Sequence, residues 1–136
     1  MFTNKIQFWK KVDILKPSFS AKWMKSHYAV PLAHHIKNDI YKIIFCIRDK
    51  NNYSNIVSFN YDIIKRKIVN KIQKKPLLIP GKLGTFDENG VTPSWLIKKG
   101  NKYYLYYVGW NKSANVRMQL FTGLALSNNN LNKFKR

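Results

Sequence analysis

Arg48, Asp49, Asp87 and Glu88 are the side chains best suited to chemistry, and each pair stands next to turn residues at the end or the beginning of a predicted strand. Closely spaced carboxylates can transfer protons or stabilise a developing positive charge. Because the chain has only six acidic residues against 25 basic ones, a concentration of three of them at such positions points to carboxylate chemistry. Asp and Asn also collect in loops because they cap turns, so a purely structural role stays open for each.

Other reactive residue types predict no site of their own. His34 and His35 lack the partners that metal ligation requires, so we expect no metal site. Cys46 is the only cysteine and lies within an apolar run, which favours a small buried side chain over a nucleophile. The chain has no glycine loop of the phosphate-binding kind and no recognisable Ser-His-Asp arrangement, and we expect no cofactor.

The elements that position these residues are predicted to be strands. Apolar or alternating runs are separated by turn-rich pieces, and no segment keeps a 3.6-residue apolar stripe over three turns. The predicted strands are 29–36, 40–47, 54–64, 67–72, 91–97, 102–110 and 118–127. The sequence therefore predicts an all-β chain.

One constant shift along the chain aligns the second group of strands with the first. It matches Pro31 with Pro93, Asp39 with Asn101, Tyr41 with Tyr103, Ile43 with Leu105, Phe45 with Tyr107 and Asp49 with Asn111. After a few extra loop residues, 122–127 aligns with 55–60. Repeats of about sixty residues, each a four-stranded meander, are typical of β-propeller blades.

In such a meander the start of the first strand and the end of the second lie at the same end, because neighbouring strands are antiparallel. This places the segments 26–27 and 48–49 beside the segments 87–89 and 110–111. The turns at 37–39 and 98–101, with His34 and His35 near the first of them, are expected at the opposite end.

Three ordered motifs resemble the five-bladed β-propeller proteins related to glycoside hydrolase families 32, 43 and 130. Residues 84–94, 103–111 and 123–127 resemble the second blade of that group. Residues 47–49, followed by 54–56 and preceded by 27–31, resemble its first blade. The resemblance covers residues 23–134 and implies about two blades of a five-bladed propeller.

The resemblance implies a sugar site at the centre of the propeller and assigns roles to seven residues. Asp87 and Asp49 are the candidate catalytic residues. The candidate substrate-binding residues are Arg48, His27, Glu88, Trp110 and Asn111. Aromatic side chains at a rim suit sugar faces, and carboxylates suit an oxocarbenium-like transition state.

Two departures from the family pattern predict weak or absent catalysis. The related hydrolases carry their catalytic base where this chain reads Lys25-Ser26-His27-Tyr28, and their general acid is a Glu of the third blade. Asp87 and Glu88 are neighbours that point to opposite sides of an extended chain, so Asp49 with Asp87 is the better pair. The expected function is therefore a glycoside hydrolase-like module of little activity, and the alternative is a non-catalytic glycan-binding or assembly module.

The formal charge of +19 suggests nucleic acid as a third kind of ligand. Lysine, asparagine, isoleucine, phenylalanine and tyrosine make up 66 of the 136 residues, and each has a codon built only of A and T. An AT-rich genome therefore accounts for much of the charge. The lysines are scattered and only four residues are arginine, so a solvated basic surface is favoured over a nucleic-acid site.

Domain organisation and partners complete the prediction. Residues 1–22 are predicted to be an N-terminal lead-in, and residues 23–136 one partial propeller-type domain with blades at about 27–75 and 87–136. Neither a membrane span nor a signal peptide is recognisable, which predicts a cytoplasmic protein. The resemblance implies a saccharide ligand. The segment after Ser127 is too short for a fourth strand, so we also expect either self-association or a chain that supplies further blades.

Overall fold

The described part of the protein is all β. The structure, a computed structural model, describes Lys11, residues 15–128 and residues 130–136. Its strands are β1 (Ser26–Lys37), β2 (Ile40–Arg48), β3 (Ser54–Asp62), β4 (Lys67–Ile68), β5 (Gly90–Lys99), β6 (Lys102–Asn111) and β7 (Gln119–Asn128). All seven predicted strands are present, although β4 is shorter than the predicted 67–72. Within the described residues, no helix has the length and apolar character needed to cross a membrane.

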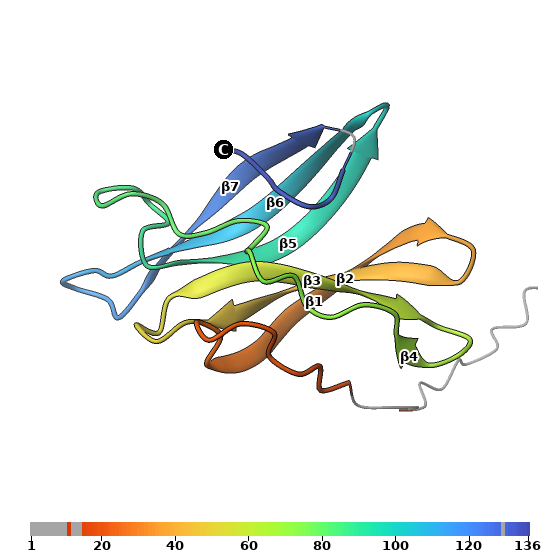
Figure 1. Ribbon diagram of the computed structural model, residues 1–136. Helices are drawn as coiled ribbons and strands as arrows, with labels where there is room; N and C mark the ends of the chain where they lie inside the picture. Colours follow the sequence, from red (N-terminus) through yellow and green to blue (C-terminus); the bar gives the residue numbers. More distant parts are fainter. Residues whose placement is uncertain (1–10, 12–14, 129) are drawn as a thin grey trace, which may run out of the picture.

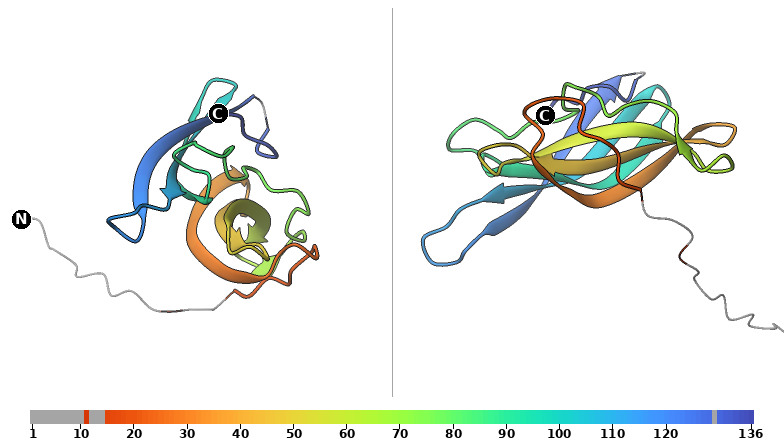
Figure 2. Two further views of the ribbon diagram at one scale, coloured as in Figure 1. Left: turned by 90° about the vertical axis from the view of Figure 1, so that its left-hand side faces the viewer. Right: turned by 60° about the horizontal axis from the view of Figure 1, so that its bottom comes forward.

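The strands form two antiparallel meanders, which we call the first meander (β1–β4) and the second meander (β5–β7) (Figure 1). They share one open sheet with the order β1-β2-β3-β5-β6-β7, and β4 pairs with β3. The two meanders are joined in this sheet by the parallel pairing of Ser54 with Gly90. Both meanders are strongly twisted, and the left view of Figure 2 shows β1 curling around the other strands of the first meander. The described strands do not close into a ring.

The bounds of the second strands agree with the predicted shift, which takes residues 40–48 of β2 to 102–110 of β6. The first strands slip against it by one position, because Ala33 lies opposite Ile43 and Leu96 opposite Leu105, whereas the shift matched Ala33 with Trp95. Phe59 and Val57 of β3 lie opposite Ile43 and Phe45, whereas Ala125 and Gly123 of β7 lie opposite Leu105 and Tyr107. In the third strands Phe59 therefore corresponds to Ala125. The predicted alignment of 122–127 with 55–60 matched Ser58 with Ala125 instead, so it was wrong by one position. Such a slip moves every side chain to the other face of the sheet.

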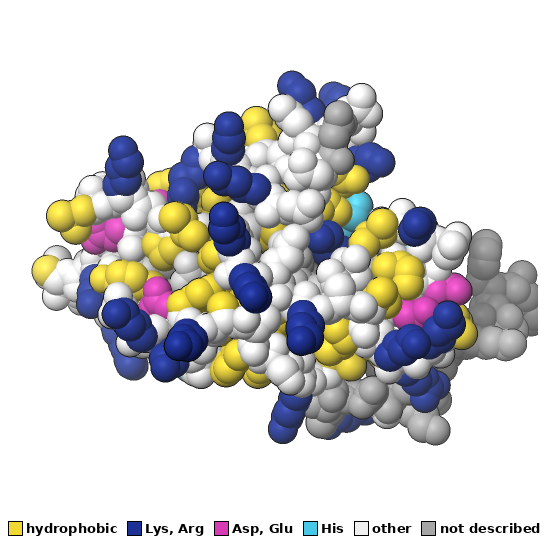
Figure 3. Space-filling model, viewed as in Figure 1, with side chains coloured by type: hydrophobic (Ala, Val, Ile, Leu, Met, Phe, Trp, Pro, Cys, Tyr) yellow, Lys and Arg dark blue, Asp and Glu magenta, His cyan; other side chains and the backbone are white. Residues whose placement is uncertain are grey.

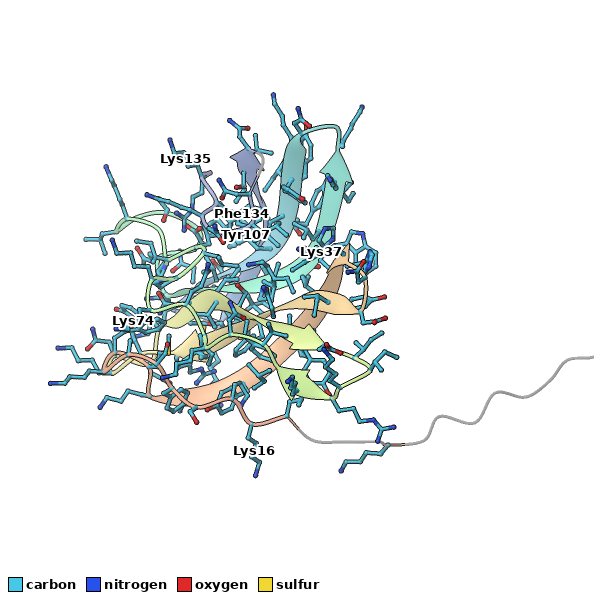
Figure 4. All side chains as sticks on the ribbon, turned by 45° about the vertical axis from the view of Figure 1, so that its right-hand side comes forward. Lys16, Lys37, Lys74, Tyr107, Phe134 and Lys135 are labelled. Atoms are coloured by element: carbon cyan, nitrogen blue, oxygen red, sulfur yellow. The ribbon has the colours of Figure 1, made fainter. Side chains whose placement is uncertain are left out.

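Two hydrophobic clusters hold the meanders together. The first packs Phe45, Ile47, Val57 and Phe59 against Met24 and Ile72. The second joins Ile44 and Ile56 of the first meander to Val91 and Leu105 of the second, and it also contains Leu77, Leu78, Tyr107, Ala125, Leu131 and Phe134. Figure 4 shows two members of this second cluster, Tyr107 and Phe134, close together beside the second meander. The second cluster therefore fixes the position of one meander relative to the other.

The segments that precede the meanders also follow the repeat. Leu15 and Met24 pack on the first meander. The shift that takes Pro31 to Pro93 takes them to Leu77 and Phe86, which pack on the second meander. Of the predicted lead-in 1–22, the part from Leu15 onward is thus packed on the sheet; residues 1–10 and 12–14 lie outside the described residues.

The C-terminal segment takes the place of a fourth strand in the second meander. The backbone N–H of Leu126 donates to the carbonyl of Lys135 over 2.7 Å, and the N–H of Lys135 donates back over 2.9 Å. Phe134 N–H donates to the carbonyl of Leu77 over 2.8 Å. As predicted, the described residues after Ser127 form no fourth strand, but the isolated bridge of Leu126 with Lys135 covers part of the β7 edge.

His34 lies where the two meanders meet. Its ring makes an edge contact with Tyr103 of β6, with the ring centroids 5.6 Å apart. Burial, the nearby charge of Lys98 and the charge of His35 lower the pKa of His34 below its ordinary value. The neutral ring is therefore the form that the junction accommodates.

We expect stability to decrease as pH falls below the ordinary histidine pKa of about 6.5. The folded protein binds this proton less tightly than the unfolded chain, so its stability is undiminished above that pKa and is lost progressively below it. Urea unfolding from about pH 8 to about pH 5 measures this, and His34→Gln should flatten the acid side of the profile. An unchanged acid profile in His34→Gln would show that other groups cause it.

Candidate functional site

A hollow of about 200 Å³ opens between the two meanders at the predicted rim. Its lining comes from β1, β2, β3, β5 and β6 and from the loops beside them. The lining residues are His27, Ala29, Val30, Cys46, Arg48, Asn52, Ser54, Asn89, Thr92, Trp110 and Met118. The structure thus brings together three of the predicted site residues, His27, Arg48 and Trp110.

An irregular stretch of β1 forms one wall of this hollow. The pairing of β1 with β2 shifts register between Ser26 and Ala29 and again between Ala29 and Leu32. His27 and Val30 fall in these shifts with positive φ angles of 62° and 50°. A β-branched residue rarely adopts such a conformation, and bulges with strained backbone concentrate beside functional sites. The two bulges place His27 and Val30 on the wall of the hollow.

Polar side chains of the hollow are held by short hydrogen bonds. Trp110 Nε1 donates to Thr92 Oγ1 over 2.8 Å, which fixes the indole against β5. An N–H of Arg48 donates to Asn52 Oδ1 over 3.0 Å. A guanidinium has five N–H groups, so Arg48 keeps donors for a ligand while this bond holds its position.

Asp87 lies outside the hollow and is completely buried. One carboxylate oxygen accepts a bond from Thr85 Oγ1 over 2.9 Å. The other accepts a bond from Tyr107 Oη over 2.9 Å and pairs with Arg136 Nε over 2.6 Å. Because all these bonds come from the protein itself, the geometry does not support a sugar-facing role for Asp87, and we interpret it as a structural anchor.

Asp49 and Glu88 also accept hydrogen bonds from the protein itself, in their case from backbone N–H groups of the nearby turns. Asp49 Oδ1 accepts the backbone N–H groups of Asn51 over 2.9 Å and Tyr53 over 3.0 Å. Glu88 accepts the backbone N–H of Gly84. The carboxylates of Asp49, Asp87 and Glu88 do not line the hollow. The predicted catalytic pair Asp49 and Asp87 is therefore not assembled at the rim.

Asn111 does not line the hollow either. Its side-chain amide donates to the backbone carbonyl of Thr85 over 3.4 Å. The hollow contains four polar residues that were not among the predicted site residues: Asn52, Ser54, Asn89 and Thr92. Asn89 and Thr92 belong to the motif at 84–94, so that motif held the signal. Asn52 has a φ of 66° in the turn after β2, and no sequence pattern marked it as part of a site.

Metal chemistry receives no support from the described part of the chain, where no group of three or more His, Cys, Asp or Glu side chains could hold an ion. The hollow is lined by an indole, a guanidinium, an imidazole, amides, two hydroxyls and a thiol. These groups bind by hydrogen bonds and by packing against an apolar face.

Two proteins of Mycobacterium tuberculosis are similar to this chain. Uncharacterized protein MT1551 (strain CDC 1551 / Oshkosh) and Uncharacterized protein Rv1502 (strain ATCC 25618 / H37Rv) are each 36% identical to it over 120 residues. The alignment covers 88% of this chain and 40% of each relative, so the chain spans well under half of their length. No protein-family model matches the chain. No solved structure matches it either.

Proposed function

We propose that this chain is a glycan-binding part of a five-bladed propeller-type protein and that the hollow between the meanders holds the saccharide. The observation that carries this proposal is the set of groups in the hollow: Trp110 beside Arg48, His27 and neutral polar side chains. Sugars are recognised by an aromatic surface under a ring face together with hydrogen-bonding groups at its edge. The volume is below the roughly 300–1,000 Å³ of drug-sized ligand sites, which suits one sugar unit.

The propeller part of the proposal is supported by the repeat and by the length of the relatives. Each meander pairs its strands in chain order, as a propeller blade does, and the second meander repeats the pairing of the first. The aligned part makes up 40% of each relative, so each relative is two and a half times as long as that part. Because the aligned part corresponds to two meanders, the full length of a relative has room for about five of them.

Binding is favoured over hydrolysis by the positions of the carboxylates. Glycoside cleavage by the usual route needs two carboxyl groups on either side of the scissile bond. Asp49, Asp87 and Glu88 are committed to turns or to the buried ion pair. We therefore expect the chain by itself to bind saccharides without cleaving them at ordinary enzyme rates.

Nucleic-acid binding is the second candidate, and the surface gives it less support. Figure 3 shows Lys and Arg side chains spread over the visible face, with hydrophobic side chains between them rather than one basic stripe. Binding to phosphates would weaken steeply with salt, whereas binding to sugar hydroxyls would not.

Screening the chain on an array of neutral and acidic saccharides, followed by titration calorimetry of the hits, tests the proposal. We expect Arg48→Met to weaken binding at least about tenfold, because one hydrogen bond to a charged group contributes about 1.5–3 kcal/mol. Trp110→Ala should also weaken it, by roughly tenfold, through loss of the aromatic surface.

Matched controls separate the hollow from the rest of the surface. Trp95 and Arg117 are exposed and lie outside the hollow, so Trp95→Ala and Arg117→Met should bind saccharide like the unaltered chain. Equal losses in the control variants, or no saccharide binding by the unaltered chain, would contradict the proposal. Oligosaccharide cleavage abolished by Asp49→Asn would restore the catalytic interpretation.

A further inference from the structure

The second meander carries an exposed apolar face opposite the one that packs on the first meander, and at its edge Trp95 shares a small hollow with Pro31 and Leu32 of β1. Six large hydrophobic side chains of β5, β6 and β7 lie at alternating positions on this face, with exposures between 37% and 66%. They are Trp95, Ile97, Tyr106, Leu120, Leu124 and Leu126. The strand pairing sets Tyr106 between Trp95 and Leu124, so these side chains form one continuous surface, which we call the outer face.

The corresponding face of the first meander is covered by the second meander. Ile44 is opposite Leu32 in the first meander, as Tyr106 is opposite Trp95 in the second. Ile44 is fully buried, and Leu32 packs against the cluster shared by both meanders. Ser58, which corresponds to Leu124, is also fully buried. The outer face is therefore a repeat of a surface that is already an interface within this chain.

The complementary side of that interface is repeated as well. The second meander contacts the first through Leu105 and Tyr103, and Leu105 is fully buried. In the first meander these positions are Ile43 and Tyr41, which are only half-buried. Ile43 also lines an apolar hollow of about 300 Å³ with Tyr28, Pro31 and others. We call this second surface the approach surface.

We propose that a second copy of this chain docks the approach surface of its first meander on the outer face of the first copy. Its contacts would repeat those between the two meanders of one chain. Within one chain Tyr103 contacts His34. In the docked pair Tyr41 would take the place of Tyr103, and Ile97 would take the place of His34. The two surfaces differ, so the contact is heterologous and propagates from copy to copy until it closes into a ring. This inference does not depend on the saccharide site.

The charge of the chain gives the association a defined response to salt. Each copy carries a formal charge of +19, so copies repel one another, whereas the outer face contributes apolar side chains. Added salt screens the repulsion, and association should therefore strengthen as salt is raised.

Sedimentation velocity over a concentration series tests the association. The unaltered chain should rise above its monomer mass of 16.1 kDa with concentration, and Leu124→Asp should weaken association by roughly 100-fold, as a charge placed in the centre of an interface does. Leu83→Asp is the matched control, because Leu83 is 95% exposed in a loop away from the outer face. A chain that stays at 16.1 kDa up to millimolar concentration, or equal losses in both variants, overturns the proposal.

Mixing two variants tests the head-to-tail geometry. Ile43→Asp disables the approach surface and Leu124→Asp disables the outer face, so each variant alone should be monomeric. Their mixture retains one intact pair of surfaces and should form a dimer of about twice 16.1 kDa. Circular dichroism establishes that each variant is folded, and Tyr41→Asp replaces Ile43→Asp if the latter unfolds. A mixture of folded variants that remains monomeric overturns the heterologous contact.

Discussion

Asp87→Ala is expected to lower the free energy of unfolding by about 1–3 kcal/mol, the usual cost of leaving a buried hydrogen-bond donor without its partner. The ion pair adds less, because the side chain of Arg136 is 35% exposed. The carboxylate of Asp87 is fully buried and is the acceptor for both Tyr107 Oη and Arg136 Nε. Without it, the hydroxyl of Tyr107 loses its acceptor inside the core, and a guanidinium loses its counter-charge. Chemical unfolding monitored by tryptophan fluorescence measures the difference.

The alkaline side of the stability profile gives an independent readout of the same contact. Burial and the hydrogen bond to Asp87 raise the pKa of Tyr107 to about 12. The folded protein therefore keeps the phenol proton at pH values where the unfolded chain has released it. This stabilisation is complete below the ordinary tyrosine pKa of about 10 and is lost between about pH 10 and about pH 12. In Asp87→Ala this alkaline loss should be smaller.

A control distinguishes the loss of the Asp87 contacts from a general effect of lost negative charge. Asp39→Ala removes an exposed carboxylate in the turn between β1 and β2, and we expect a change within about 0.5 kcal/mol. If Asp87→Ala were as mild as Asp39→Ala, the contacts of Asp87 would contribute little to stability.

The strands could be predicted from the sequence because apolar residues alternate along most of them and turn residues separate them. The register of the third strands could not. Residues Ser54 to Phe59 of β3 are buried on both faces, so their hydrophobicity does not show which side chains share a face. Nothing in the sequence marked the two bulges in β1 either, because Val30 is β-branched and disfavours a positive φ, and a single histidine such as His27 does not by itself indicate one.

The place of the site followed from strand order, but the directions of its side chains did not. Antiparallel pairing put His27, Arg48 and Trp110 at one end of the meanders, and they do line one hollow. Asp87 lies near the same end but turns into the core. Its partners Tyr107 and Arg136 are 20 and 49 residues away along the chain, so only the folded arrangement shows that the carboxylate is occupied.

Gly123→Ala should also destabilise the protein, by about 1–3 kcal/mol, because an added methyl group would overlap the ring of Tyr107. A Cβ on Gly123 would lie 2.6 Å from the hydroxyl oxygen of Tyr107 and closer still to its Cζ. The ring cannot retreat freely, since Asp87 holds its hydroxyl and Phe86 stacks against it with ring centroids 6.0 Å apart. Thermal unfolding of Gly123→Ala beside Thr122→Ala, a change at the exposed neighbour, measures the effect.

The comparison with the first meander explains why this glycine is needed. Val57 lies opposite Phe45 in the first meander, at the positions that Gly123 and Tyr107 occupy in the second. The smaller residue at 123 leaves room for the ring that reaches Asp87. The penalties of Gly123→Ala and Asp87→Ala should therefore not add, because a displaced Tyr107 has already lost its bond to Asp87. A double variant whose loss equals the sum of the two single losses would show that Gly123 and Asp87 act independently.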